Sequence, residues 1–172
     1  MPKRNDLVTF NGMPLTLVGD PIQRGERLPD VPLVDTSMQP RSLGEFRGKV
    51  LLISVVGSLD TSVCDAQTRA VSAKGAALGD DVVRLTISVD TPMAQARWLR
   101  HTGAAGVVLL SDFKDHAFGL QTGVRVEESG MLARALIVVD REGVVSYVQV
   151  SPDVDVEPEY EPALEAVRAL LG

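Results

Sequence analysis

Short apolar runs rich in valine, leucine and isoleucine recur along the chain and alternate with segments of helical periodicity. Such runs are typical of buried strands. The predicted strands are Val50–Val56, Val82–Val89, Val107–Leu110, Ala133–Val139 and Val144–Val150. Between the earlier strands, Ser62–Leu78 and Pro92–His101 predict helices. A last helix is expected to begin at Pro158 or Glu159 and to end near Leu171.

The polar and turn-forming residues divide the rest of the chain. Val8–Leu17 predicts a β-hairpin, about residues 7–18, because Asn11-Gly12 is a strong hairpin-turn pair. The proline-rich segment Pro21–Pro32 is expected to be extended and on the surface. Ser42–Gly48 predicts one helical turn, with serine as its cap and glycine as its stop. Asp140–Gly143 predicts the turn of a second hairpin.

The order of these elements predicts an α/β fold. Helical crossovers between the earlier strands make parallel neighbours, whereas the late hairpin must be antiparallel. We therefore expect a thioredoxin-like fold with a mixed central sheet flanked by helices and an N-terminal β-hairpin, as one domain over residues 1–172. In such sheets ligands gather beyond the carboxyl ends of central strands, and Cys64 lies just past one of them.

Composition narrows the possible functions. The net charge is −6, which argues against binding to nucleic acid or to an anionic membrane. We see neither a secretory signal nor an apolar stretch long enough to span a membrane, so a cytoplasmic location is expected. A single cysteine excludes an internal disulfide and a multi-cysteine zinc site. The acidic stretch Asp153–Glu157 lacks the pattern of a calcium loop, so no metal or other cofactor is expected.

Cys64 follows a predicted strand at the start of a predicted helix, where a helix N-terminus can stabilise a thiolate. Most isolated cysteines, however, are small buried hydrophobic residues without a chemical role. Thr61 stands three residues earlier, and taken alone it is best interpreted as a helix cap. Arg134 begins an apolar run, where an arginine is usually an edge or surface residue.

Motifs spread along nearly the whole chain give these residues a common context. They are the hairpin with its Asn-Gly turn, Ser58–Cys64, Ile87–Asp90, Ala94–Arg97, Leu110–Lys114, Phe118-Gly119, Gly123-Val124, Leu132–Arg134 and Glu157–Tyr160. In this order and at this spacing, the sequence resembles the thiol peroxidase branch of the peroxiredoxins.

The resemblance implies that Cys64 reduces a peroxide, either hydrogen peroxide or an organic hydroperoxide, and becomes a sulfenic acid. A free cysteine has a pKa of about 8.5, so most of it is protonated at neutral pH. The resemblance therefore implies that the helix N-terminus and a nearby cation favour the thiolate. In the family the cation is an arginine at the position of Arg134. Thr61 and Arg134 would position the peroxide bond and stabilise the leaving oxygen. The resemblance also implies a homodimer.

Two departures from the family pattern lie beside the cysteine. Gly57 replaces a proline that would restrict the loop, so lower reactivity or another loop shape is expected. Asp65 follows the cysteine directly, and its charge opposes ionisation of the thiol. Adjacent helical residues point in different directions, so we expect that effect to be modest.

The third departure is the absence of a resolving cysteine. The family commonly carries one on the helix after Ala94–Arg97, at the position of Leu99. The sulfenic acid must then be recycled by an external thiol, by a disulfide between two Cys64 residues of different chains, or by another reductant. We favour direct attack by a low-molecular-weight thiol or a thioredoxin-like protein, which is a one-cysteine mechanism.

Other functions remain as alternatives. Cys64 could belong to a weakly active redox sensor or binding module, which Gly57 and the missing second thiol favour. A cysteine hydrolase using His101 or His116 is disfavoured because neither lies in an acyl-transfer motif. A disulfide reductase would need a Cys-X-X-Cys pair. For Arg97, a structural salt bridge and a role in the site remain open.

Overall fold

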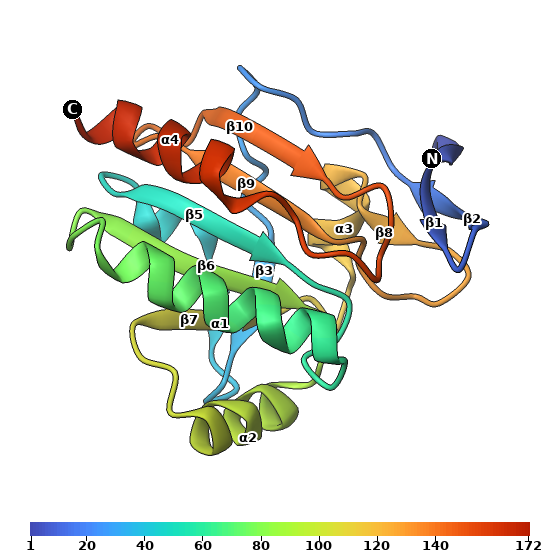
Figure 1. Ribbon diagram of the computed structural model, residues 1–172, viewed down its shortest axis with the longest axis horizontal. Helices are drawn as coiled ribbons and strands as arrows, with labels where there is room; N and C mark the ends of the chain where they lie inside the picture. Colours follow the sequence, from blue (N-terminus) through green and yellow to red (C-terminus); the bar gives the residue numbers. More distant parts are fainter.

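The computed structural model describes residues 1–172, and a seven-stranded mixed sheet forms its centre (Figure 1). The strand order is β10-β9-β5-β6-β7-β3-β4. The strands are β3 (Pro32–Asp35), β4 (Pro40–Ser42), β5 (Val50–Val55), β6 (Val82–Ser88), β7 (Val107–Ser111), β9 (Ala135–Val139) and β10 (Val145–Val150). β5, β6 and β7 are parallel, whereas β9 is antiparallel to both β5 and β10. The predicted mixed sheet is therefore confirmed.

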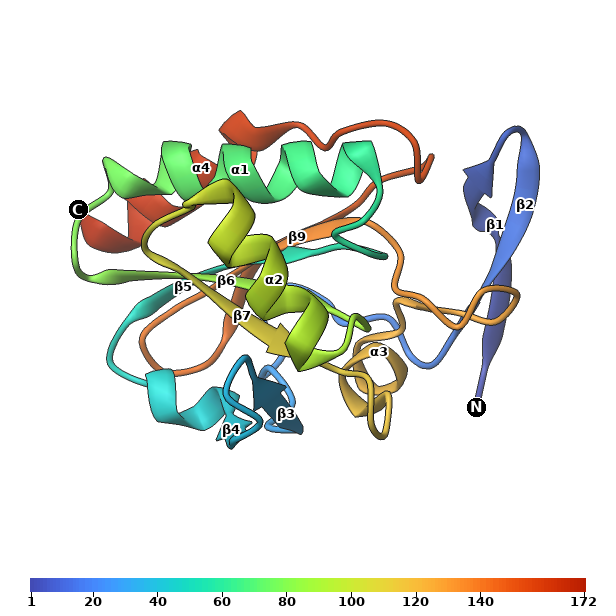
Figure 2. The ribbon, with the colours of Figure 1, turned by 90° about the horizontal axis from the view of Figure 1, so that it is seen from below.

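Helices cover both faces of this sheet (Figures 1 and 2). They are α1 (Ser62–Ala76), α2 (Pro92–Thr102), α3 (Ala117–Thr122), α4 (Tyr160–Leu171) and a short 3₁₀ helix, η1 (Leu43–Phe46). Successive side chains of a strand point to opposite faces of the sheet, so each strand contributes to the packing on both sides. On β5, Leu52 packs with α1 and α4, while Ile53 belongs to the larger cluster on the α3 side.

A second, smaller sheet contains the predicted hairpin. β1 (Lys3–Phe10) and β2 (Met13–Val18) pair with each other, and β2 pairs with β8 (Arg125–Val126). Asn11 and Gly12 adopt φ angles of 51° and 77°, the left-handed conformations that this turn requires. The hairpin is also tied to the connection before α4, because the Thr9 N–H donates to the Pro152 carbonyl at 2.9 Å and the Val154 N–H donates to Thr9 at 3.1 Å.

Several elements differ from the sequence-based expectations. β3, β4, β8 and α3 were not predicted, and the segment Pro21–Pro32 is not confined to the surface. Its apolar side chains Ile22, Leu28 and Val31 are buried in the larger core. β9 begins at Ala135, so Arg134 precedes the strand instead of belonging to it. No helix is long and apolar enough to cross a membrane.

Candidate active site

Cys64 lies in the first turn of α1, immediately beyond the loop that follows β5. The fully buried run of β5 fixes the end of the strand in the core, and the chain then turns through a short loop into the helix. Only 2% of the Cys64 surface is exposed. The sequence prediction that this thiol sits at a strand-to-helix junction is therefore confirmed.

Arg134, the residue just before β9, brings a cation to this thiol from beside β5. Its side chain is 4% exposed, and its Nη2 lies 3.4 Å from Cys64 Sγ. Two further bonds hold the guanidinium, because Nε and Nη2 donate to the Val154 carbonyl at 3.0 and 2.5 Å. Arg134 is therefore not the surface residue that its place in the sequence would ordinarily indicate, because its side chain is buried and faces the cysteine.

Gln67 completes the support of Arg134 and was not identified from the sequence. Its Oε1 accepts a hydrogen bond from Arg134 Nη1 at 2.8 Å, and its Nε2 donates to the Ser54 hydroxyl at 2.8 Å. The residue is fully buried. A helical-face argument could have found it, because Gln67 shares the buried face of α1 with Cys64 and Val71.

No carboxylate lies within ion-pair distance of Arg134. Its hydrogen-bond partners are neutral oxygens and the Cys64 sulfur. A buried charge is costly unless another charge compensates it. Among these partners, the Cys64 sulfur is the one group whose chemistry allows a negative charge.

Thr61 is the N-cap residue of α1, but its side chain does not cap the helix. Its Oγ1 instead donates to the Ser58 carbonyl at 2.9 Å. Thr61 thus occupies the predicted cap position, but its hydroxyl satisfies a loop carbonyl in place of a helix N–H. Thr61 still lines the same cavity as Cys64 and Arg134.

The loop that contains Thr61 is fixed by Asp90, which follows β6. The Ser58 hydroxyl donates to Asp90 Oδ1 at 2.7 Å, and the Leu59 N–H donates to Oδ2 at 2.8 Å. A third donor, the Ser88 hydroxyl, reaches Oδ2 at 2.7 Å. One carboxylate therefore connects the Cys64 loop to the end of the neighbouring strand.

Asp65 connects the first turn of α1 to α2. Its Oδ1 accepts from the Trp98 indole N–H at 2.7 Å, and its Oδ2 accepts from Arg69 Nε at 2.9 Å. Both carboxylate oxygens therefore have donors of their own. Beneath this contact, Trp98 and Cys64 belong to one apolar cluster, and Leu99 packs against it. The position expected for a resolving cysteine thus holds an apolar side chain that packs against the cluster containing the thiol.

A cavity of about 290 Å³ lies against the thiol. Its walls are mainly apolar and come from distant parts of the chain: the hairpin, the β8 region, the Cys64 loop and the connection before α4. They include Phe10, Leu15, Val126, Met131, Leu132 and Val154. Gly57 also lines it, and a β-carbon there would lie 3.4 Å from the Leu132 carbonyl, an ordinary contact. A larger residue would therefore fit at position 57, so lack of space does not explain the glycine.

The remaining sequence candidates lie outside this cavity. His101 is in the last turn of α2 and His116 precedes α3, so neither histidine lines the cavity with Cys64. The hydrolase alternative therefore has no base at the thiol. Arg97 pairs with Asp60 at 3.5 Å between two well-exposed side chains. No group of three or more histidine, cysteine or acidic residues is placed to hold a metal ion.

Comparisons with known proteins show what the whole chain is similar to. The redoxin family model matches residues 23–164. Thiol peroxidase of Bacillus subtilis is 43% identical over 164 residues, which cover 95% of this chain and 98% of that protein. A peroxiredoxin-like protein from Aquifex aeolicus has a TM-score of 0.90 at 32% identity, with 99% of each chain covered. Thiol peroxidase from Chromobacterium violaceum has a TM-score of 0.85 at 22% identity, covering 94% of this chain and 95% of that one. At 22% identity, the last likeness bears on the fold alone. Together these structures confirm the predicted thioredoxin-like fold.

Proposed function

The chain belongs to the redoxin family and within it to the thiol peroxidases, and we propose that it reduces peroxides with Cys64 as its peroxidatic thiol. Residues 1–172 act as one domain in this proposal. The observation that carries it is the contact between Cys64 Sγ and Arg134 Nη2 at 3.4 Å, made by a buried cation that no carboxylate neutralises.

The reaction begins with attack of the Cys64 thiolate on one peroxide oxygen. An S–O bond forms, the O–O bond breaks, and the electron pair leaves with the other oxygen, which takes up a proton and departs as water or an alcohol. The sulfur is oxidised to a sulfenic acid and the peroxide is reduced. Arg134 stabilises the charge that develops on the oxygens, and the Thr61 hydroxyl orients the peroxide in the cavity.

The second half of the cycle needs an external thiol, because the chain contains no other cysteine. A low-molecular-weight thiol or a thioredoxin-like protein reduces the sulfenic acid in a one-cysteine mechanism. The resemblance to the thiol peroxidases supports a homodimer. A cytoplasmic location, where thiol reductants are abundant, is consistent with this chemistry.

A redox sensor is the second candidate, and the single thiol favours it. A sensor forms the same sulfenic acid but is not recycled at a useful rate. Leu99 in the place of a resolving cysteine removes the intramolecular step that would drive turnover.

One equivalent of hydrogen peroxide or cumene hydroperoxide, mixed with the reduced protein, tests the proposal. Stopped-flow fluorescence of Trp98 and intact mass should show rapid addition of one oxygen atom, and Cys64→Ser should not react. The peroxidase proposal is wrong if Cys64 reacts no faster than free cysteine. Turnover with an added thiol then separates the enzyme from the sensor.

A further inference from the structure

We propose that the thiol that recycles Cys64 is a low-molecular-weight thiol that enters through the cavity beneath the hairpin, and that two side-chain clamps exclude protein thiols. The first clamp is Asp90 with its donors Ser58 and Leu59, and the second is Asp65 with its donor Trp98. The inference rests on the proposed peroxidase function and identifies the partner of the same site.

Burial of the sulfur is the first argument. A reducing thiol must approach to within bonding distance, because the mixed disulfide has an S–S length of about 2.05 Å. Cys64 is 2% exposed, so a cysteine fixed on a folded protein surface cannot reach its sulfur in this conformation. The cavity of about 290 Å³ is close to the lower limit for small-molecule sites and accommodates a thiol of a few heavy atoms.

The clamps are the second argument, because a protein thiol could react only if the first turn of α1 and its loop opened. Opening the loop would break the bonds of Asp90 to the Ser58 hydroxyl at 2.7 Å and to the Leu59 N–H at 2.8 Å. Hydrogen bonds to a charged acceptor are among the stronger ones in proteins. This loop therefore opens rarely.

The second clamp joins the first turn of α1 to α2. Asp65, adjacent to Cys64, accepts the indole N–H of Trp98 at 2.7 Å. The indole ring and Leu99 pack in the apolar cluster that contains Cys64. Unwinding the first turn would expose this cluster to water in addition to breaking the bond. With leucine instead of a thiol on α2, unwinding would also bring no second sulfur to Cys64.

The chemistry balances with two molecules of a monothiol. The first thiolate attacks the sulfenic sulfur, an S–S bond forms, the S–O bond breaks, and hydroxide leaves and is protonated to water. The second thiolate attacks the sulfur of the small thiol in this mixed disulfide. The small disulfide and the Cys64 thiolate are released, so the monothiol is oxidised and the protein is restored.

Reduction of the preformed sulfenic acid tests the inference directly. The protein is oxidised with one equivalent of peroxide, and intact mass confirms the sulfenic acid. It is then mixed with 2-mercaptoethanol, cysteine or a reduced thioredoxin at equal thiolate concentration. We expect the protein dithiol to react at least about tenfold more slowly than the small thiols, because it must await opening of the clamps.

Variants make the test specific to the clamps. Asp90→Ala and Trp98→Phe should each accelerate reduction by the protein dithiol by about tenfold and change the rates of the small thiols by less than about threefold. Asp35→Ala is the matched control, since Asp35 also accepts bonds from Ser37, Gln39 and Arg41 but lies outside the cavity. It should leave both rates unchanged.

Alkylation of the reduced protein gives a readout independent of peroxide. Iodoacetamide should modify Cys64 readily, whereas a maleimide attached to a large polymer should react at least about tenfold more slowly until a clamp is removed. Equal alkylation by the two reagents overturns the inference, as does faster reduction of the wild-type protein by thioredoxin than by the small thiols. If no sulfenic acid forms at all, the proposed function fails first and the inference falls with it.

Discussion

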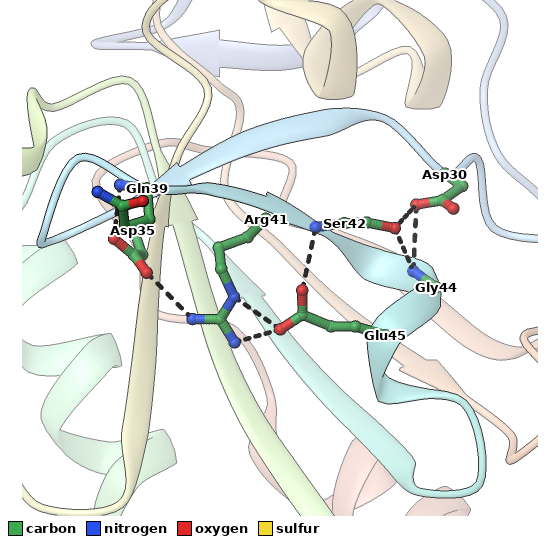
Figure 3. A network of polar contacts seen from close by, with 7 residues as sticks. All are labelled: Asp30, Asp35, Gln39, Arg41, Ser42, Gly44 and Glu45. Carbon is green, nitrogen blue, oxygen red and sulfur yellow. Dashed lines mark hydrogen bonds and ion pairs between the residues drawn. The ribbon is translucent and has the colours of Figure 1, made fainter.

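Arg134 and Arg41 hold two polar networks that differ in what surrounds the guanidinium. Arg41 lies beside η1, where it pairs with Glu45 and with Asp35 at 3.3 Å (Figure 3). Its side chain is 28% exposed. Arg134 is nearly enclosed, and its oxygen partners are a carbonyl and an amide, both uncharged.

In the proposed function, the same side chain serves structure at Arg41 and chemistry at Arg134. At Arg41, two carboxylates neutralise the positive charge. The hydrogen bonds from Arg41 lower the pKa of Glu45, although partial burial of that carboxyl acts in the opposite direction. At Arg134 the oxygens fix the orientation of the guanidinium but leave its charge uncompensated. Arg134 therefore differs from Arg41 both in the missing carboxylate and in its lower exposure.

The largest effect is expected from removing the charge at Arg134. Arg134→Met should slow oxidation of Cys64 by peroxide by about 100- to 1,000-fold, because the developing negative charge loses its cation. Arg134→Lys keeps the charge but loses the planar fork, so it should recover only part of this rate. Stopped-flow measurement of sulfenic acid formation checks both. The matched variant Arg41→Met should react as the wild type does, and equal slowing in both variants would contradict the comparison.

A smaller effect on stability is expected at Arg41. Arg41→Met should lower the free energy of unfolding by about 1 kcal/mol or less at neutral pH, because these ion pairs are partly exposed. The folded-state pKa values of Asp35 and Glu45 are lowered, so their stabilisation is present above the ordinary carboxyl pKa of about 4 and is lost as the pH falls. Urea unfolding at several pH values should show the variant and the wild type converging in acid. A difference that grows in acid would contradict this assignment.

The smallest effect is expected at Gly57, where neither network is touched. Gly57→Pro should stabilise the fold by about 0.4–1 kcal/mol through the unfolded chain. The Gly57 N–H makes no backbone hydrogen bond, and a β-carbon there has ordinary contacts, so nothing is lost on substitution. Gly57→Pro should change the rate of Cys64 oxidation by less than Arg134→Lys does. Thermal unfolding and stopped flow check the two quantities, and destabilisation would show that the loop needs a conformation closed to proline.

The regular part of the fold could be predicted because its signals are local. The β5 and β9 runs are buried on both faces, so they appear as continuous apolar stretches. The missed elements depend on distant partners. α3 is six residues long and follows His116 in a left-handed conformation, and its first N–H groups are bound by the Asp112 carboxylate from the preceding loop. No pattern within that helix indicates its cap.

The site divides in the same way. Cys64 and Arg134 were predicted from motifs, and the structure places Arg134 Nη2 3.4 Å from Cys64 Sγ. Gln67 was missed because a glutamine in a helix is ordinarily solvated, and the Val154 carbonyl was missed because a backbone group has no residue type. The direction of the Thr61 hydroxyl depends on the loop carbonyl of Ser58, which sequence spacing does not encode.

The hairpin and the connection before α4 have a consequence for synthesis of the chain. Arg134 is held by the carbonyl of Val154, and Val154 in turn is bound by Thr9 of β1. During translation at about 5–20 residues per second, the Val154 carbonyl is made several seconds after Cys64. A nascent chain thus carries the sulfur long before its guanidinium is anchored. In the proposed function, the part of the Cys64 reactivity that depends on Arg134 would therefore arise only after the connection before α4 has folded back onto the first strand.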